Sequence, residues 1–263
     1  MASRKEQKAQ ARERMRQEME RRKRRARRNR IIGVVAGATA VVVAAVVVGI
    51  VVQTHRAKDE GPAPKGAVAN NLAIPVGQKD APVTLTVYED FRCPACKQFE
   101  QRYDSTIGKL VEAGKLRVRY HIATIIDANY PGTEGSKLAG NAAACAFEEG
   151  KFTEYHDVLY QNQPPETTDG FTTEQLLKLA KNVKGLKGND TFESCVKDET
   201  YVPWLKRVQK EFDTRFNGRV ATPSFLLDGE VMLGGKQQQI APQMRTPQAF
   251  EQTVEKRYRK RTG

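Results

Sequence analysis

Apolar and polar positions alternate in two segments of the chain. Residues 83–88 and 116–122 both alternate and are rich in β-branched and aromatic side chains, which predicts two strands. Between them, residues 93–112 have apolar positions at helical spacing, which predicts a helix. A strand, a helix and a strand in this order favour parallel pairing of the two strands.

The rest of the pattern predicts a block of helices and then a return to strands. We expect helices over the Ala-rich residues 136–149 and over 152–160 and 190–197, and apolar residues at helical spacing indicate another over 202–216. Another helix opens at Thr172, where Gln175 three residues later completes a capping box. Strands follow at residues 224–227 and 231–233, and a last helix at 247–258. The chain therefore predicts an α/β fold, a small sheet with a helical insertion over about residues 130–217.

A third pattern is an uninterrupted apolar run. The 22 residues from 31 to 52 carry no charge and are mostly Val, Ala, Ile and Gly. As a helix they span roughly 33 Å, enough to cross a hydrocarbon core of about 30 Å. Residues 1–30 before them hold 14 Lys and Arg against 4 Glu, a net charge of +10. Because basic flanks stay in the cytoplasm, we expect a transmembrane helix at 31–52, a basic cytoplasmic tail at 1–30 and an extracytoplasmic remainder.

Other roles for this N-terminal region are less well supported. A cleaved signal peptide has a shorter apolar core of about 7–15 residues, with a small-x-small site close behind it. The nearest such site here, Ala67-Val68-Ala69, lies well downstream. Nucleic-acid binding is disfavoured because residues 1–30 contain no aromatic side chain to stack on bases. Residues 53–71 mix Gly and Pro with charges and are predicted to be a flexible linker, so the folded domain begins near Leu72.

Candidate chemistry lies in Cys93-Pro94-Ala95-Cys96, where the first strand gives way to its helix. The attacking species in disulfide exchange is a thiolate, and a helix N-terminus favours it with free N–H groups and positive partial charge. The two-residue gap lets Cys96 close on Cys93 and resolve a mixed disulfide. Pro94 falls in the first turn, where its missing N–H costs little. We expect Cys93 to be the nucleophile and Cys96 the resolving cysteine, with Arg92 either stabilising the thiolate or merely solvated.

Two other roles stay open for this cysteine pair, a zinc site and a purely structural disulfide. Zinc needs two more ligands at suitable spacing, whereas Cys145 and Cys195 are lone cysteines far along the chain. We therefore expect no metal and no cofactor beyond the two thiols.

A second candidate element is Ala221-Thr222-Pro223-Ser224, which opens a predicted strand. Proline inside a sheet cannot donate to the hydrogen-bond ladder. A cis bond between Thr222 and Pro223 at the strand start would resolve this and mark a constrained site, but the residues taken alone favour a trans proline on an edge strand.

These segments together resemble the DsbA-like thioredoxin-fold family of disulfide oxidoreductases. The resemblance covers about residues 72–258, in the same order along the chain. The matching segments are 83–99 with its Cys-x-x-Cys motif, Asn141 to Cys145, Tyr155-His156, Phe171-Thr172, Phe192 to Cys195 and Thr222-Pro223-Ser224. It implies a thioredoxin-like domain at 72–258, followed by a short tail at 259–263.

The resemblance also assigns roles. It implies that Thr222-Pro223 is a cis-proline loop facing Cys93, which holds a substrate segment by backbone pairing. Asp90, Arg92 and Pro94 are expected to support the active site.

Two departures from the family pattern concern proton transfer and redox potential. Many relatives carry an acidic residue six positions before the first cysteine, where this chain has Val87. In relatives this residue relays protons to the resolving thiol, and Glu89 and Asp90 are the candidates to substitute for it here. Alternation from Val87 puts Glu89 on the same, buried face and Asp90 on the opposite one. The Pro-Ala dipeptide also lacks the histidine of the strongest oxidants in the family, which leaves the potential open. His121 and His156 are expected to be packing or surface residues.

The remaining two cysteines, Cys145 and Cys195, both fall in the helical insertion. Outside the cytoplasm two unpaired thiols tend to oxidise, which favours a structural disulfide over two buried free cysteines. Relatives with this cysteine pair bridge it, so the resemblance points the same way.

The expected function is disulfide exchange with secreted or membrane-anchored proteins that contain cysteines. Oxidation of substrates is favoured over reduction because of the resemblance, and an oxidase needs a quinone-linked partner in the membrane. The alternatives are a thiol reductant and a binding or chaperone-like module without turnover.

Overall fold

The computed structural model describes residues 61–263, together with residues 15, 19, 21–23, 44, 46 and 47. The chain divides into two units, Met1–Lys58 and Asp59–Gly263, and the fold below is that of the second. Among the described residues, none of the helices combines the length and apolar composition that crossing a bilayer requires. The basic tail and the spanning helix predicted for residues 1–30 and 31–52 lie outside the described residues, apart from those single positions.

A five-stranded sheet forms the centre of the domain, in the order β1-β3-β2-β4-β5. Its strands are β1 (Ile74–Val76), β2 (Val83–Glu89), β3 (Leu116–Ile122), β4 (Ser224–Leu227) and β5 (Glu230–Leu233). The predicted parallel pairing of β2 with β3 is confirmed, and all other neighbours are antiparallel. Six of the seven residues of β2 are buried, because this central strand is covered on both faces.

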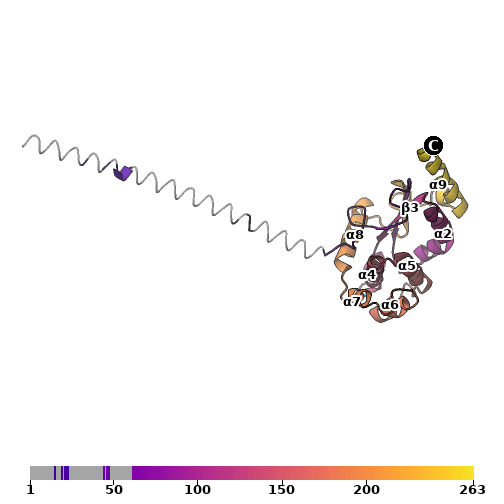
Figure 1. Cartoon of the computed structure of the whole chain (residues 1–263), viewed down its shortest axis with the longest axis horizontal. Helices are drawn as coiled ribbons and strands as arrows, with labels where there is room; N and C mark the ends of the chain where they lie inside the picture. The colour runs from indigo at the N-terminus through magenta and orange to yellow at the C-terminus, as the bar shows by residue number, and fades with distance from the viewer. Residues whose placement is uncertain (1–14, 16–18, 20, 24–43, 45, 48–60) are drawn as a thin grey trace, which may run out of the picture. The chain divides into compact units, whose positions relative to one another are not determined.

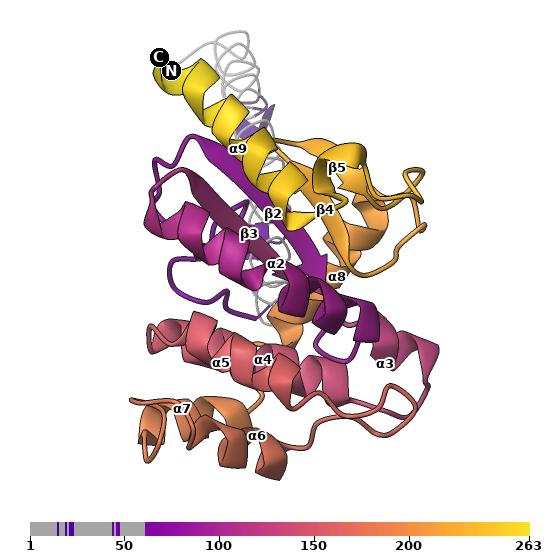
Figure 2. The ribbon, with the colours of Figure 1, turned by 90° about the vertical axis from the view of Figure 1, so that its right-hand side faces the viewer.

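Helices cover the sheet, and the helices of the insertion pack together next to it. Figure 2 shows α2 and α9 over one face of the sheet, with α4 to α7 stacked below it. The helices are α2 (Pro94–Glu112), α3 (Ile125–Asn129), α4 (Gly135–Glu148), α5 (Phe152–Gln161), α6 (Thr173–Ala180), α7 (Asp190–Lys197), α8 (Val202–Arg215) and α9 (Pro247–Thr262), with the 3-10 turn η1 at Pro242–Met244. The domain is thus the expected α/β, thioredoxin-like arrangement, with a helical insertion between β3 and β4.

Local sequence explains where several of these helices begin. The capping box of Thr172 and Gln175 is confirmed at the start of α6, since each side chain bonds the other residue's backbone N–H. Pro94 and Pro247 are first-turn residues of α2 and α9, where a proline loses no helical bond.

The structure corrects the predicted ends of the domain. The second half of the linker predicted for residues 53–71 packs on the domain, since the Trp204 indole N–H donates to the Asn71 carbonyl oxygen at 2.6 Å. Ala63 contacts the core as well. At the other end, the predicted tail at 259–263 continues α9 to Thr262, where basic residues in the last turn suit the negative end of the helix dipole.

Candidate active site

Cys93 is the residue immediately before α2. Its backbone is extended, with φ −76° and ψ 117°, and Pro94 is the first helical residue. The N–H groups of Cys96 and Lys97 point back to the Cys93 carbonyl oxygen, at 3.1 and 3.2 Å. The sulfur of Cys93 therefore lies at the positive end of a 19-residue helix.

The Cys93 thiol faces the loop that opens β4. It donates to the Thr222 carbonyl oxygen at 3.1 Å, across a sequence separation of 129 residues. The Thr222–Pro223 peptide bond is cis, and β4 begins at the next residue. The structure thus brings together the two segments, Cys93 to Cys96 and Thr222-Pro223, that the sequence singles out.

The two thiols of the motif have opposite acidities. A hydrogen bond from the Cys96 thiol lowers the pKa of Cys93 to about 6, although burial alone would raise it. Burial raises the pKa of Cys96 well above its ordinary value, and its hydrogen bond to Cys93 raises it further. Near neutral pH, Cys93 is accordingly the thiolate and Cys96 the proton-carrying thiol, which suits attack by the first and resolution by the second.

Asp90 holds the turn before Cys93. Its carboxylate accepts the N–H groups of Arg92 and Ile126, both at 2.9 Å, and the Cys93 N–H bonds the Asp90 carbonyl oxygen. Burial raises the pKa of Asp90 to about 7. Sequence alternation places Asp90 opposite the buried Glu89, whereas the structure buries both, because α3 covers the strand end at Asp90.

Arg92 is buried and its guanidinium is engaged on the side of the helical insertion. It pairs with Asp127 at 2.6 Å and donates to the Thr168 carbonyl oxygen at 2.5 Å. The side chain passes beneath Gly170, where φ is +84° and an added Cβ would lie 2.6 Å from Arg92 Nε. These bonds join Arg92, the residue before Cys93, to α3 and to the loop before α6.

Gln163 is a contributor that sequence reasoning missed. Its amide donates to the carbonyl oxygens of Phe91 and Cys93, at 2.8 and 3.0 Å. It thereby ties the active-site turn to the segment after α5. Nothing in the sequence marks this glutamine, because it stands in a polar loop of ordinary composition.

A groove borders the cysteine motif. Its volume is about 430 Å³, and its lining combines the cis-proline loop with the loop after β5. The lining residues are Ala95, Arg219, Val220, Ala221, Thr222, Pro223, Leu233, Gly234, Gly235, Gln237 and Gln238. The groove is thus a concave surface that the cis-proline loop forms together with Ala95 of the cysteine motif.

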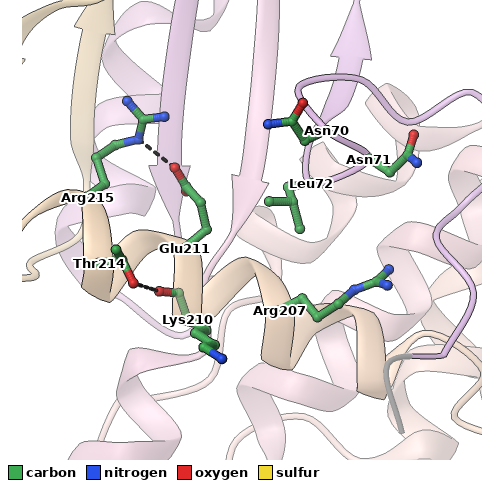
Figure 3. Close-up of a pocket in the computed structure, with 8 residues that line it drawn as sticks. All are labelled: Asn70, Asn71, Leu72, Arg207, Lys210, Glu211, Thr214 and Arg215. Carbon is green, nitrogen blue, oxygen red and sulfur yellow. Dashed lines mark hydrogen bonds and ion pairs between the residues drawn. The ribbon is translucent and has the colours of Figure 1, made fainter. Parts of the chain in front are cut away.

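A larger cavity, of about 850 Å³, lies elsewhere in the domain (Figure 3). It is lined by residues 70–72 and by the polar side of α8, with no residue of the cysteine motif. Arg215 on its wall is paired with Glu211 at 2.6 Å. This charged cavity is therefore separate from the groove beside the cysteine motif.

A buried group of ionisable side chains lies behind the motif. Glu89, Glu100 and His156 have potential ligand atoms within 4.8 Å of one another, and all three are buried. His156 Nε2 contacts Glu89 Oε1 at 3.0 Å. His156 was predicted to be a packing or surface histidine, and the structure makes it half of a buried ion pair. Three potential ligands fall short of the four that a structural zinc site takes.

The second cysteine pair forms a disulfide between α4 and α7. The S–S distance of Cys145–Cys195 is 2.07 Å and the Cα atoms lie 5.9 Å apart. Asn141, one turn before Cys145, donates to the Val196 carbonyl oxygen and accepts the Tyr201 N–H. The disulfide therefore joins α4 to α7 close to the place where the hydrogen bonds of Asn141 also connect them.

Comparison with known proteins defines the class. The thioredoxin family model Thioredoxin_4 matches residues 70–255. The chain belongs to this family, and with the cysteine geometry above it is a thiol–disulfide oxidoreductase of the DsbA-like kind.

Individual relatives agree with this class. Disulfide bond formation protein D of Bacillus subtilis is 27% identical over 161 residues, which cover 60% of this chain and 68% of that protein. The probable disulfide bond formation protein D of Bacillus cereus is 29% identical over 164 residues, which cover 57% of this chain and 72% of that protein.

Solved structures share the fold. Reduced DsbA from Mycobacterium tuberculosis superimposes with a TM-score of 0.56 at 23% identity, covering 70% of this chain and 91% of that one. Oxidised BdbD from Bacillus subtilis gives a TM-score of 0.56 at 24% identity, covering 75% and 98%. These similarities extend over the described domain and support its thioredoxin-like architecture.

Proposed function

We propose that the protein forms disulfides in secreted or membrane-anchored proteins outside the cytoplasm, with Cys93 as nucleophile and Cys96 as resolving cysteine. The observation that carries the proposal is the split in acidity between the two thiols at the start of α2, with Cys93 facing the cis-proline loop. Thr222-Pro223 and the adjoining groove would hold the client segment by backbone pairing.

Substrate oxidation proceeds by two exchanges. A client thiolate attacks the Cys93 sulfur of the Cys93–Cys96 disulfide, and Cys96 leaves and takes up a proton. A second thiolate of the same client then attacks the client sulfur that is bonded to Cys93. This leaves the client oxidised and Cys93 as a thiolate. Two electrons have passed to the protein.

The oxidising direction follows from the low pKa of Cys93. A thiolate that is stabilised in the folded protein stabilises the reduced form, which makes the corresponding disulfide a stronger oxidant. Reoxidation then needs a partner disulfide, and we assign this role to a quinone-linked membrane protein. A membrane anchor at residues 31–52, with the basic segment 1–30 inside, would keep the two together.

Trapping of clients tests this function directly. In a Cys96→Ala variant the mixed disulfide between Cys93 and a client lacks its resolving thiol, so covalent adducts should accumulate and disappear on reduction. The matched control, Cys93→Ser with Cys96 retained, should form no adducts. Equal cellular function of the Cys93→Ser variant and the unsubstituted protein would instead indicate a binding module.

Equilibration of the Cys93–Cys96 pair with glutathione tests the direction. An oxidant should have a potential well above that of thioredoxin, which lies at about −270 mV. A value near that of thioredoxin would overturn the oxidant assignment and indicate a reductant.

A further inference from the structure

A pocket separate from the cysteine groove is lined by arginines. Its volume is about 390 Å³, within the range of about 300–1,000 Å³ that is usual for small-molecule sites. Four arginines line it, Arg117, Arg119, Arg215 and Arg261, together with one carboxylate, Asp228. We call it the arginine pocket, and its excess of positive charge makes it a candidate site for an anion.

Two adjacent strands form the floor of the arginine pocket. In the parallel register of β2 and β3, Thr84 lies beside Arg117 and Thr86 lies beside Arg119. Side chains two positions apart in a strand point to the same face of the sheet, and all four of these side chains line the pocket. Arg117 Nε donates to the Thr84 hydroxyl oxygen at 2.8 Å. The floor therefore presents two guanidinium groups and two hydroxyl groups on one side of the sheet.

The next row of the sheet closes one end of the pocket. Tyr88 lies beside His121 in that row, and Phe212 of α8 stacks on Tyr88 with ring centroids 4.6 Å apart. Burial lowers the pKa of His121 to about 3, and the positive charges of Arg215 and Arg119 lower it further. His121 is accordingly a neutral wall residue, with a guanidinium group from α8 and one from β3 close to it.

Two of the four arginines have carboxylate partners. Arg215 pairs with Glu211 at 2.6 Å, and Arg261 pairs with Asp228 at 2.8 Å. Asp228 also pairs with Arg257 at 3.1 Å, so this carboxylate is already shared between two arginines of α9. The acidic side chains near the pocket are thus engaged by cations other than those of the floor.

The two arginines of the floor lack such a partner. Among residues 61–263, no carboxylate pairs with Arg117 or Arg119, and Arg117 donates to neutral oxygens only, those of the Thr84 hydroxyl and the Lys79 carbonyl. Partial burial lowers the pKa of Arg119, and the positive charge of Arg117 lowers it further. Like charges that are partly removed from water repel each other, and an anion bound between the two guanidinium groups would offset this repulsion.

The charge and geometry of the floor favour a phosphoryl group over other anions. A phosphomonoester carries a charge of about −1.5 to −2 at pH 7, which matches two guanidinium groups better than the single charge of a carboxylate or a phosphodiester does. The planar fork of an arginine can donate two parallel hydrogen bonds to phosphate oxygens, and threonine hydroxyls can donate further ones. The volume of the pocket leaves space for the small organic group that bears the phosphate.

We propose that the arginine pocket binds the dianionic phosphoryl group of a small phosphomonoester, with Arg117 and Arg119 as its charge partners and Thr86 as a hydroxyl donor. This site is independent of disulfide exchange. It adjoins the first half of β2, whereas Cys93 follows the other end of that strand. Ligand binding should therefore leave the rate of exchange with glutathione unchanged.

Isothermal titration calorimetry of the full chain tests the site, with phenyl phosphate as the phosphomonoester probe. One equivalent should bind, and Arg117→Gln and Arg119→Gln should each weaken binding at least about tenfold, because each removes a charge-assisted hydrogen bond. The matched control, Arg102→Gln, removes the same charge from an exposed position of α2 and should leave the affinity unchanged. Equal affinities of all three variants and the unsubstituted protein would overturn the site.

Other probes identify the chemistry of the ligand. Inorganic phosphate should displace phenyl phosphate, because the two share the dianionic group. Dimethyl phosphate carries a single charge and should bind at least about tenfold more weakly than phenyl phosphate. Binding of phosphatidylglycerol vesicles without any binding of phenyl phosphate would overturn the proposal and indicate a lipid surface as the partner.

Chemical modification locates the bound ligand without any substitution. Phenylglyoxal reacts with arginine side chains, and peptide mass spectrometry of the treated protein identifies which of them have reacted. Phenyl phosphate should slow the modification of Arg117 and Arg119 and leave that of Arg102 unchanged. Equal rates with and without phenyl phosphate would overturn the assignment, even if the substituted proteins failed to fold.

Discussion

Cys93 and Cys96 are residues of one type, three positions apart, and their different surroundings give the two thiols different pKa values. The hydrogen bond from Cys96 is the largest contribution to the low pKa of Cys93, and burial is the largest contribution to the high pKa of Cys96. Each thiol is therefore tuned partly by the other. Substitution of either residue changes the chemistry of both.

The rate of alkylation of the reduced protein by iodoacetamide, followed against pH, measures the pKa of Cys93. Because the pKa of Cys93 is lowered to about 6, its thiolate forms as pH rises through 6, and the alkylation rate should reach half its plateau there. A Cys96→Ala variant lacks the thiol donor, so its midpoint should move upward, toward the ordinary value of about 8.5. A midpoint near 8.5 in the unsubstituted protein would contradict the assignment of Cys93 as an activated nucleophile.

Sequence alone indicates the residues whose type is diagnostic and misses those whose role depends on burial. Cys93, Cys96 and Pro223 stand out because two cysteines at a helix start and a proline at a strand start have few uses. Glu100 does not stand out, since most glutamates in helices face solvent. Its position four residues after Cys96, on the apolar face of the helix, is the signal that could have identified it.

At the scale of elements, strong periodicity predicts structure and short segments escape it. β4 and α7 have the predicted bounds, at residues 224–227 and 190–197. β1 and α3 were missed because three and five residues are too few for a period to be recognised. β1 is fixed instead by antiparallel pairing with β3, between residues that lie 42 to 46 positions apart in the sequence.

The disulfide between α4 and α7 gives a prediction at this scale. Replacing Cys145 and Cys195 together with alanine should lower the free energy of unfolding by roughly 2–4 kcal/mol, because the bridge closes a loop of 50 residues. The bridge belongs to the insertion and not to the cysteine groove, so the glutathione exchange rate of the folded variant should stay within about twofold of the original, as expected for independent sites. Chemical unfolding and the exchange assay check the two parts.

At the scale of the whole molecule, charge and hydropathy are segregated along the chain. Residues 1–30 carry +10 of the net charge of +13, and the apolar run 31–52 separates them from the catalytic domain. Composition averaged over the chain conceals this division.

The predicted linker extends too far toward the C-terminus, to residue 71. Gly61 and Pro64 resemble spacer residues, and the sequence does not reveal the tertiary contact of Asn71 with Trp204.

Membrane attachment through residues 31–52 is testable with the full chain. Replacing Val41 and Val43, which lie near the centre of the predicted spanning helix, with Lys should raise the free energy of membrane insertion by about 2.5–3.5 kcal/mol for each substitution. The double variant Val41→Lys, Val43→Lys should therefore shift from the carbonate-resistant membrane fraction to the soluble fraction, while Gln53→Lys with Thr54→Lys, beyond the run, should not. Both should keep the glutathione exchange rate of the original, because the thiols belong to a separate unit of the chain. If carbonate extracted the unsubstituted chain from the membrane, the apolar run would not span the bilayer. The encounter of the protein with its membrane partner would then need another explanation.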